Sequence, residues 1–559
     1  MKSKKIISLI VGTCLISSLG LFGCGEAKKT TSKASEKKMD KEQYINANLQ
    51  AEPKSLDPCK GTDGYCCQVF QETIEGLTRL ETDANGEDCI KPAGAEKWEH
   101  NEEGTVWTFH LRDYKWQDGK KVTAKNYVYA FKRSLDPKTG APQCNLLYPI
   151  KNAEAINQGK ASTDSLGAKA IDDNTLELTL EKPCPYFFQL TFNKSYLPQR
   201  QDIVEKYKDK YGSDGDKYIS CGPFVIDHWT HNSEIVLKKN DKYWDKKKIN
   251  LEKVNFKIIK DPTASNNSLY SGSLDLGGVS KQEWIKKFDA TKKFDRIQAV
   301  LPALNYSFFN CKDKVFKNAN IRKAFILGTT REDLGKVIFK GRFNPGYGAI
   351  PPKVKIDGKE FRDIAEEPVK QLQKENPDPK VLLKKGMKEL GLGDDPSKLD
   401  VTVLQAGTDQ WSRTYAEYIQ QMYKKTLGVT IKAEYVEWPV FQKRTDEGKF
   451  QLGGMAGSGD YNDPNTFMDG FISSSQYTPV FWKNEEYDKL VVGCQTLMDQ
   501  KKRIEDYKKA EHILIHDEGV ISPELYRTRN TYKYKYVKGL MIPLFGKVEY
   551  KYAYTDGRQ

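Results

Sequence analysis

Two histidine pairs are the residues whose spacing comes nearest to metal chemistry. His512 and His516 are four positions apart in the segment Ala510-Glu-His-Ile-Leu-Ile-His-Asp517, which would put both imidazoles on one face of a helix. An amphipathic helix explains the same spacing without a metal, and we favour that explanation. His228 and His231 follow a strand-like run and are expected in a surface loop. The sequence therefore predicts no metal site.

Motifs of the main hydrolase and nucleotide-binding classes are missing from the chain. There is no H-E-x-x-H for zinc proteolysis, no G-x-S-x-G for serine hydrolysis and no G-x-x-x-x-G-K-[ST] for phosphate binding. The acidic pair Asp172-Asp173 is explained by a turn and not by glycoside hydrolysis. We therefore expect a protein that is not an enzyme and that requires no cofactor.

The cysteines leave the redox state of the protein open. The chain has eleven, and Cys14 and Cys24 lie in the N-terminal segment, which leaves nine in the body. An odd number means that at least one is unpaired or pairs with another chain. Disulfides suit an exported protein, whereas an anaerobic habitat would leave every thiol reduced, and the spacing reveals no pairing. Adjacent Cys66 and Cys67 are poorly placed to share a tetrahedral metal.

The N-terminus has the pattern of an export signal that ends in a cysteine. Positively charged residues precede an apolar run from Ile6 to Phe22, and a small residue precedes Cys24. The run is at the short limit for a membrane-spanning helix. The block Leu21-Phe-Gly-Cys24 resembles a bacterial lipobox, which implies that residues 1–23 are removed and that Cys24 carries a lipid. An ordinary secreted protein and an uncleaved anchor are the alternatives.

Composition indicates a globular body on a flexible tether. Residues 24–44 are polar, rich in Lys and Ser and without periodicity, as expected of a lipidated, disordered tether. The rest of the chain is long enough for several domains, and no later segment is apolar and long enough to span a bilayer. The net charge is +13, but no Arg-rich stripe with interleaved aromatic residues is present, so nucleic acid is not an expected partner.

Short strand-like and helical runs alternate along the body and predict an α/β fold. Apolar and polar residues alternate, as in half-buried strands, over Thr105–Leu111, Leu176–Leu180 and Glu234–Leu237. Helical patterns are found over Asn126–Leu135, Val381–Leu390 and Arg413–Leu427. We find no internal repeat.

Several segments, each unspecific alone, occur together in an order and spacing that resembles one family. The most informative are Glu52–Pro58, Phe70–Leu77, Lys115–Gly119, Val122–Tyr127, Cys221–Phe224, Leu237–Trp244, Phe316–Ala324 and Gly459–Pro464. From about Ile45 to the C-terminus, the chain is similar to the oligopeptide-binding lipoproteins of ABC peptide importers, which are extracellular solute-binding proteins of family 5.

The resemblance implies the clamshell fold of a type II periplasmic binding protein. Two α/β lobes would be joined by crossing strands, and a hinge motion would close them around a ligand. Lobe I would comprise residues 45–75, 200–302 and 528–559, and lobe II residues 303–527. An extra domain, residues 76–199, would be inserted in lobe I.

The resemblance also places candidate ligand-binding residues in the last third of the chain. Asp460 fills the aspartate position of the family's A-D-Y-N-D/E-P segment, where it would pair with the α-ammonium of a peptide. The alternative is that Asp460 caps a turn, because Asn-Asp-Pro is strong turn chemistry. Ala456, Gly457 and Ser458 would line the cleft with backbone groups, and some relatives carry a tryptophan where Gly457 stands. Asp463 is expected to support the local structure.

Two further residues are candidates with an ordinary structural alternative. Trp438 matches the family's E-W segment and would flank a ligand side chain, although tryptophan is also a common core residue. Gly64 lies in the loop Gly61–Tyr65 and would present backbone to the peptide, or it simply marks a turn.

The expected function is that of a monomeric, lipid-anchored receptor on the extracellular face of the cell membrane. It would capture oligopeptides and deliver them to the permease and ATPase subunits of an ABC transporter. Backbone pairing to an extended peptide is blind to side chains, so selectivity would come from the peptide's ends. A receptor for a nickel complex, haem or an oligosaccharide is one alternative, and a peptide-sensing signalling protein is another. A peptidase or sugar hydrolase would need a catalytic constellation that the sequence lacks.

Overall fold

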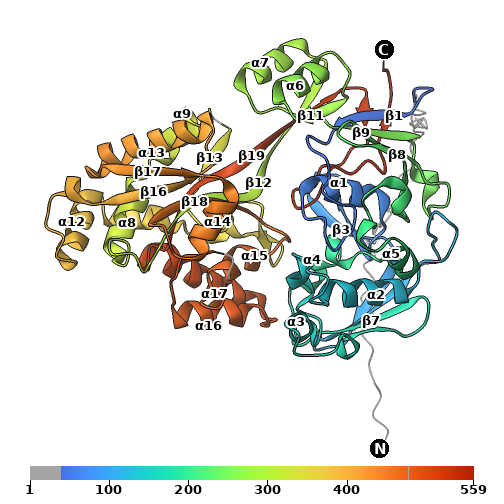
Figure 1. Cartoon of the computed structure of the whole chain (residues 1–559), viewed down its shortest axis with the longest axis horizontal. Coiled ribbons are helices and arrows are strands. Elements are labelled where there is room, and N and C mark those ends of the chain that lie inside the picture. The colour runs from blue at the N-terminus through green and yellow to red at the C-terminus, as the bar shows by residue number, and fades with distance from the viewer. Residues whose placement is uncertain (1–38, 341, 476–477, 559) are drawn as a thin grey trace, which may run out of the picture.

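Two lobes lie side by side and are joined by two long strands (Figure 1). The computed structural model describes residues 39–340, 342–475 and 478–558, so the expected signal 1–23 and Cys24 lie outside the described residues. Strands β12 (Phe294–Phe309) and β19 (Ile521–Tyr534) pass from one lobe to the other. The expected two-lobed α/β architecture with crossing strands is confirmed.

One sheet of eleven strands extends through both lobes of the described chain, in the order β17-β16-β18-β12-β19-β11-β1-β10-β9-β8, with β13 paired to β19. Its remaining strands are β1 (Tyr44–Asn48), β8 (Phe224–Thr230), β9 (Glu234–Lys239), β10 (Lys253–Lys257), β11 (Leu276–Gly278), β13 (Phe343–Pro345), β16 (Val401–Ala406), β17 (Ile431–Val436) and β18 (Leu452–Ser458).

The crossing strands β12 and β19 pair antiparallel and change register between the lobes. The register shifts between Val300 and Leu304 and again between Asn305 and Tyr306. The first shift lies at the start of the stretch of β12 that pairs with β18 in lobe II, and the second lies inside that stretch. Both lie beyond the part of β19 that pairs with β11 in lobe I. Bulges of this kind bend and twist a strand pair, so this is the natural place for a hinge.

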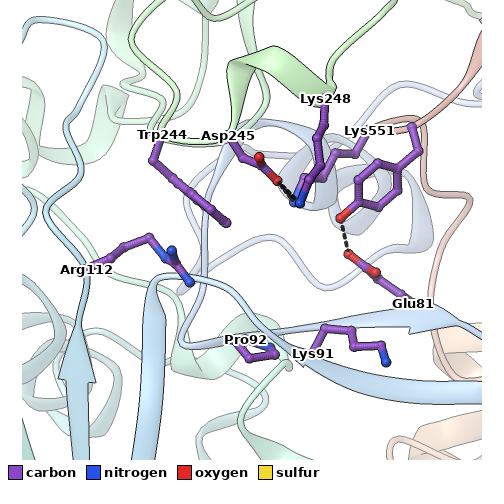
Figure 2. A pocket seen from close by; sticks show the side chains of 9 residues that line it. Glu81, Lys91, Pro92, Arg112, Trp244, Asp245, Lys248 and Lys551 are labelled. Atoms are coloured by element: carbon purple, nitrogen blue, oxygen red, sulfur yellow. Dashed lines mark hydrogen bonds and ion pairs between the residues drawn. The ribbon is translucent and has the colours of Figure 1, made fainter. Parts of the chain in front are cut away.

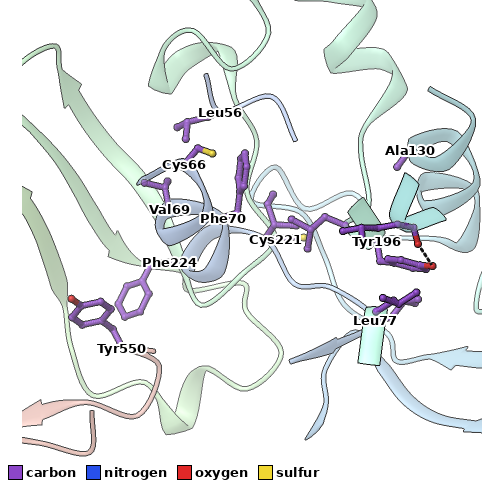
Figure 3. Close-up of a cluster of buried hydrophobic side chains, with 14 of the residues drawn as sticks. Leu56, Cys66, Val69, Phe70, Leu77, Ala130, Tyr196, Cys221, Phe224 and Tyr550 are labelled. Atoms are coloured by element: carbon purple, nitrogen blue, oxygen red, sulfur yellow. Dashed lines mark hydrogen bonds between the residues drawn. The ribbon is translucent and has the colours of Figure 1, made fainter. Parts of the chain in front are cut away.

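Lobe I is built around α1 (Gly64–Thr73), whose first turn is capped by Asp63. The Asp63 carboxylate accepts hydrogen bonds from the N–H groups of Tyr65 (3.0 Å) and Cys66 (2.8 Å). Behind this cap, Phe70 and its neighbours enter an apolar core that includes Phe224 and Tyr550 toward the large sheet, and Ala130 and Tyr196 on the other side (Figure 3).

Residues between α1 and β8 add smaller elements to lobe I. They form a four-stranded sheet, β4 (Ala95–His100), β5 (Val106–Leu111), β7 (Thr175–Thr179) and β6 (Ala168–Ala170), and a hairpin, β2 (Thr78–Thr82) and β3 (Asp88–Pro92). The helices of this lobe after α1 are α2 (Ala124–Leu135), α3 (Ala153–Asn157), α4 (Phe187–Leu190), α5 (Gln201–Tyr207), α6 (Pro262–Tyr270) and α7 (Gln282–Thr291). The short pair β20 (Val537–Lys538) and β21 (Tyr554–Thr555) lies near the C-terminus.

Lobe II has its own apolar core, which runs from Leu304 to Tyr526. Its helices are α8 (Ala319–Gly328), α9 (Arg331–Val337), α10 (Phe361–Ile364), α11 (Pro368–Glu375), α12 (Pro379–Glu389), α13 (Gln410–Leu427), α14 (Trp438–Asp446), α15 (Asn465–Met468), α16 (Glu485–Cys494) and α17 (Gln500–His512). A small hairpin is formed by β14 (Lys355–Ile356) and β15 (Lys359–Glu360). A π-helical turn, Ile513–Asp517, continues α17.

The strands and helices that the sequence predicted are confirmed as β5, β7, β9, α2, α12 and α13. Two local expectations were wrong. His228 lies within strand β8 and not in a loop, because its exposed side chain is accommodated on the solvent face of an outer strand. Tyr44, the expected end of the tether, begins β1, and Asp40 already accepts hydrogen bonds from Gly557 and Arg558, so the folded body begins before residue 44.

Within the described part of the chain, no helix is long and apolar enough to cross a membrane. The nine cysteines of this part are all free thiols. Most of them are buried, which lets them pack as small apolar side chains.

Candidate functional site

A cavity of about 260 Å³ lies between the lobes. Lobe I contributes one side of α1, strand β2, Gln143 and the segments 192–197 and 545–547, and lobe II contributes the end of β18 and the loop that follows it. The lining residues include Gly64, Cys67, Arg79, Lys194, Ser458, Asp460 and Lys547, and the Arg79 guanidinium already pairs with Glu75 and Glu549. The sequence predicted Gly64, Ser458 and Asp460 as binding residues, and the structure brings these three together.

Asp460 carries a carboxylate that forms no hydrogen bond or ion pair with any residue that the structure describes. Its backbone N–H donates to Thr466 Oγ1 at 3.1 Å, which fixes the loop but leaves the side chain open to solvent in the cavity. The surrounding protein displaces water and raises the pKa of Asp460, while the positive charge of Lys194 acts in the opposite direction. An unpaired carboxylate in such surroundings is a strong acceptor for a cation.

Gly459 places Asp460 at the end of the strand. A Cβ atom at this position would come within 2.8 Å of Phe545 and 3.0 Å of Phe467, so no larger residue fits without movement. The Gly459 N–H donates to the carbonyl of Pro302 at 2.9 Å. This bond ties the loop to β12 just before the stretch of β12 that pairs with β18.

Asp463 has the structural role that the sequence assigned to it. Its two carboxylate oxygens each accept a hydrogen bond from Arg503 at 2.9 Å, and one also accepts from the Asn465 N–H at 3.0 Å. The capping role considered for Asp460 therefore belongs to Asp463. Burial raises the pKa of Asp463, and Arg503 opposes that rise.

Along the stretch that leads to Asp460, one edge of strand β18 has no strand partner in the described chain. It pairs with β12 along its whole length, from Leu452–Phe309 to Ser458–Ala303. On the other side it pairs with β16 only at Leu452 and Gly453. In the described chain, the backbone from Gly454 to Ser458 thus has an edge without a strand partner, as recognition by strand addition requires. Ala456 and Gly457 lie on this stretch, where they were expected to present backbone, although neither lines the cavity itself.

Trp438 lies away from the cavity. It is the first residue of α14, 48% of its surface is exposed, and it stacks on Phe441 with ring centroids 5.5 Å apart. The expectation that it flanks a ligand side chain stays a prediction.

Most cavity residues were not found from the sequence, and three of them bear directly on the charge of the site. Lys194 and Lys547 place two positive charges at the cavity, and Cys67 lies near both. A hydrogen bond from Cys66, followed by the charges of these lysines, lowers the pKa of the Cys67 thiol to about 7. Only the adjacent cysteines gave a visible signal in the sequence, whereas single lysines hundreds of residues apart give none.

A second cavity, of about 390 Å³, lies wholly within lobe I (Figure 2). Most of its charges are already engaged. Asp245 pairs with Lys248 at 3.2 Å and with Lys551 at 3.3 Å, and the Arg112 guanidinium lies 3.6 Å from the centre of the Trp244 ring. The free carboxylate lies in the interlobe cavity and the free strand edge leads to it, so this cavity is the better candidate.

Two lobes, a pair of crossing strands and a polar cavity between the lobes define the class of two-lobed solute-binding proteins. The family model of the bacterial extracellular solute-binding proteins, family 5 Middle, matches residues 90–479. The chain belongs to this family, which is a family of solute-binding proteins and not a class of enzymes.

Known relatives are similar over nearly the whole chain. The oligopeptide-binding protein OppA of Bacillus subtilis is 35% identical over 553 residues, which cover 98% of each chain. The dipeptide-binding protein DppE of the same species is 33% identical and covers 97% of this chain and 98% of its own. Among solved structures, Listeria monocytogenes OppA bound to peptide has a TM-score of 0.75 and 29% identity, and the match covers 93% of this chain and all of that one.

Proposed function

We propose that this protein is an extracellular receptor that captures oligopeptides between its lobes and delivers them to an ABC transporter. The observation that carries the proposal is the unpaired Asp460 carboxylate at the end of a strand with a free edge. The peptide-binding relatives and the peptide-bound structure named above support it.

The geometry suits an extended peptide that runs antiparallel to β18. Its first residue would then lie at the C-terminal end of the strand, where the α-ammonium meets Asp460. The following residues would pair through their backbone with Gly454–Ser458, which requires no particular side chains. Haem or an oligosaccharide lacks the regular row of N–H and C=O groups that this edge offers to a strand, so the edge favours a peptide over those solutes.

The attachment and the partners belong to the proposal as well. A lipid on Cys24 and a tether that ends before the folded body would hold a monomeric receptor at the outer face of the cell membrane. Permease and ATPase subunits would accept the peptide. The expected boundaries of lobe I, the inserted domain and lobe II are kept as part of the proposal, and the separate apolar cores support the division between lobe I and lobe II. We propose no catalytic activity.

Calorimetry with paired peptides tests the proposal. Wild type is expected to bind peptides with a free amino terminus and to bind their N-acetylated forms much more weakly. Asp460→Asn should lose about 2–5 kcal/mol for the free peptide, since one partner of a buried charge pair is removed. The variant should bind free and acetylated peptides alike.

Asp209→Asn provides the matched control, because Asp209 is fully exposed on lobe I and forms only a long ion pair of 3.5 Å with Lys60. It should bind both peptides as wild type does. If wild type itself does not distinguish free from acetylated peptide, the assignment of Asp460 to the amino terminus is wrong. Failure of every peptide to bind would contradict the proposed function itself.

A further inference from the structure

A second cluster of potential ligands lies in lobe II, outside the interlobe cavity. His512, His516 and Asp517 each offer one metal-ligating atom, and these atoms all lie within 4.8 Å of one another. None of the three residues lines the interlobe cavity. The sequence alone explained the two histidines by an amphipathic helix, but it gave no reason to add Asp517.

The π-helical turn is what brings Asp517 to the histidines. Helix α17 ends at His512 and continues as the π-helix Ile513–Asp517. In an α-helix, residue i+5 points well away from residue i, whereas the wider π-turn, with its i to i+5 hydrogen bonds, returns residue i+5 to the face of residue i. One Asp517 oxygen, Oδ1, consequently lies 3.3 Å from His512 Nε2 and 2.9 Å from His516 Nδ1.

Each imidazole is also held from its outer side. His512 Nδ1 lies 3.1 Å from the amide oxygen of Gln371, and His516 Nε2 lies 2.8 Å from a carboxylate oxygen of Glu375. Both partners come from α11, and both oxygens accept hydrogen bonds, so each outer nitrogen donates its proton to α11. The inner nitrogens, His512 Nε2 and His516 Nδ1, are then the ones that face Asp517, and each can offer a lone pair to a metal once no proton is shared with that carboxylate.

This arrangement resembles a metal site, with potential ligands on the inside and hydrogen-bond acceptors behind both imidazole rings. Metal-binding histidines usually donate their second N–H to a carboxylate or carbonyl oxygen, which fixes the tautomer and the ring orientation. Here both rings have such a contact. We propose that His512, His516 and Asp517 bind a divalent first-row transition metal such as Zn²⁺.

The donor set determines the class of metal. Two imidazole nitrogens and one carboxylate oxygen suit Zn²⁺, Ni²⁺ or Co²⁺ better than Ca²⁺ or Mg²⁺, which prefer oxygen ligands. Water completes the coordination, because a site with three protein ligands keeps open positions. The rings stack at 4.1 Å with planes 21° apart, so one of them turns about its side-chain axis when the metal enters. A proton that His516 Nδ1 shares with Asp517 is released to solvent at the same time.

Titration of the mature protein with Zn²⁺ tests the proposal, after accessible thiols have been blocked with N-ethylmaleimide. We expect one equivalent to bind with a dissociation constant in the micromolar range. His512→Gln, His516→Gln and Asp517→Asn should each weaken binding by about 10-fold or more. Bound metal should also raise the melting temperature of wild type but not of these variants.

His231→Gln is the matched control. His231 also lies between two carboxylates, Glu52 and Asp214, but it has no second imidazole beside it. This variant should bind Zn²⁺ as wild type does. The proposal is overturned if the three ligand variants keep the affinity of wild type, or if His231→Gln loses as much.

A second measurement does not depend on any variant. Co²⁺ added to the thiol-blocked wild type should give visible absorption bands typical of coordination by nitrogen and oxygen at low coordination number, and Zn²⁺ should displace it. The spectrum of hexa-aquo Co²⁺ alone would contradict the proposal. Loss of Zn²⁺ binding together with unchanged peptide binding would leave the proposed function intact, because the two sites share no residue.

Discussion

Two aspartates three positions apart have opposite environments, and that contrast decides which of them can bind a ligand. Asp463 is buried and pairs with Arg503 through both oxygens, so its charge is already compensated inside the protein. Asp460 is open to the cavity and has no such partner in the described chain. Only the second kind of carboxylate gains a new charge-assisted hydrogen bond when an ammonium group arrives.

A third aspartate near this loop predicts how stability depends on pH. Burial, and then the negative charge of Asp460, raise the pKa of Asp469 to about 7. Because this carboxyl binds its proton more tightly in the folded state, its contribution to stability is present below the unfolded pKa and is lost as the pH rises toward 7. Asp469→Asn should remove this loss. Between pH 5.5 and pH 8, the variant should gain about 1–2 kcal/mol in free energy of unfolding relative to wild type.

Urea unfolding at several pH values measures this difference. Asp209→Asn, which changes an exposed aspartate that does not line the cavity, should retain the pH dependence of wild type. An Asp469→Asn profile parallel to that of wild type would contradict the prediction.

How much of the site the sequence reveals depends on whether its residues form a pattern. Asp460 and Ser458 lie in one contiguous segment, so their place in the chain was enough to name them. Lys194 and Lys547 reach the same cavity from positions that are distant in sequence, and isolated lysines are indistinguishable from any solvated surface lysine. Such residues are found only when the fold brings them together.

At the scale of elements, an ion pair links the loop after β18 to α17, although α15 and α16 lie between them in the chain. The Asp463–Arg503 ion pair ties that loop to α17, and Arg503 also donates to the carbonyl of Cys494 at 3.0 Å. The loop therefore depends on a helix that comes about forty residues later, and a change in α17 should reach the binding loop.

Arg503→Met tests this dependence. The substitution leaves the Asp463 carboxylate buried without its partner, which commonly costs about 3–5 kcal/mol of stability. The double variant Asp463→Leu, Arg503→Met replaces both charges with apolar groups and should recover most of the loss. Urea unfolding of the single and double variants measures both effects. A single variant that loses less than about 1 kcal/mol would show that the pair does not hold the loop.

Element types were largely predictable because hydrophobic periodicity is local, as in β5 and α13. The exceptions are places where a long-range contact overrides local pattern. His228 belongs to a strand because β8 pairs with β9, and the end of α17 widens into a π-turn that no periodicity of the segment marks. The extent of the crossing strands was likewise not visible, since pairing between β12 and β19 joins segments more than two hundred residues apart.

At the scale of the whole molecule, the lobes touch at a few points besides the crossing strands. Tyr186 of lobe I stacks on Tyr461 of lobe II with ring centroids 5.0 Å apart, and its hydroxyl accepts a hydrogen bond from Asn465 at 3.3 Å. Lys355 and Glu87 form an ion pair of 2.7 Å between the lobes. Contacts made only when the lobes meet favour the closed form, so they add to the apparent affinity for any ligand that requires closure.

Tyr186→Leu should therefore weaken peptide binding without touching the peptide's amino terminus. An aromatic pair contributes about 0.5–1.5 kcal/mol beyond its buried area, which corresponds to a dissociation constant about 2- to 10-fold higher. The preference for free over acetylated peptides should persist, because Asp460 is unchanged.

Small-angle scattering should show that the variant needs more peptide than wild type to reach the smaller radius of gyration of the closed form. Tyr207→Leu, in α5 of lobe I, is the control and should behave as wild type. Unchanged affinity in Tyr186→Leu would mean that this stack exists equally in the open and closed forms and does not favour closure.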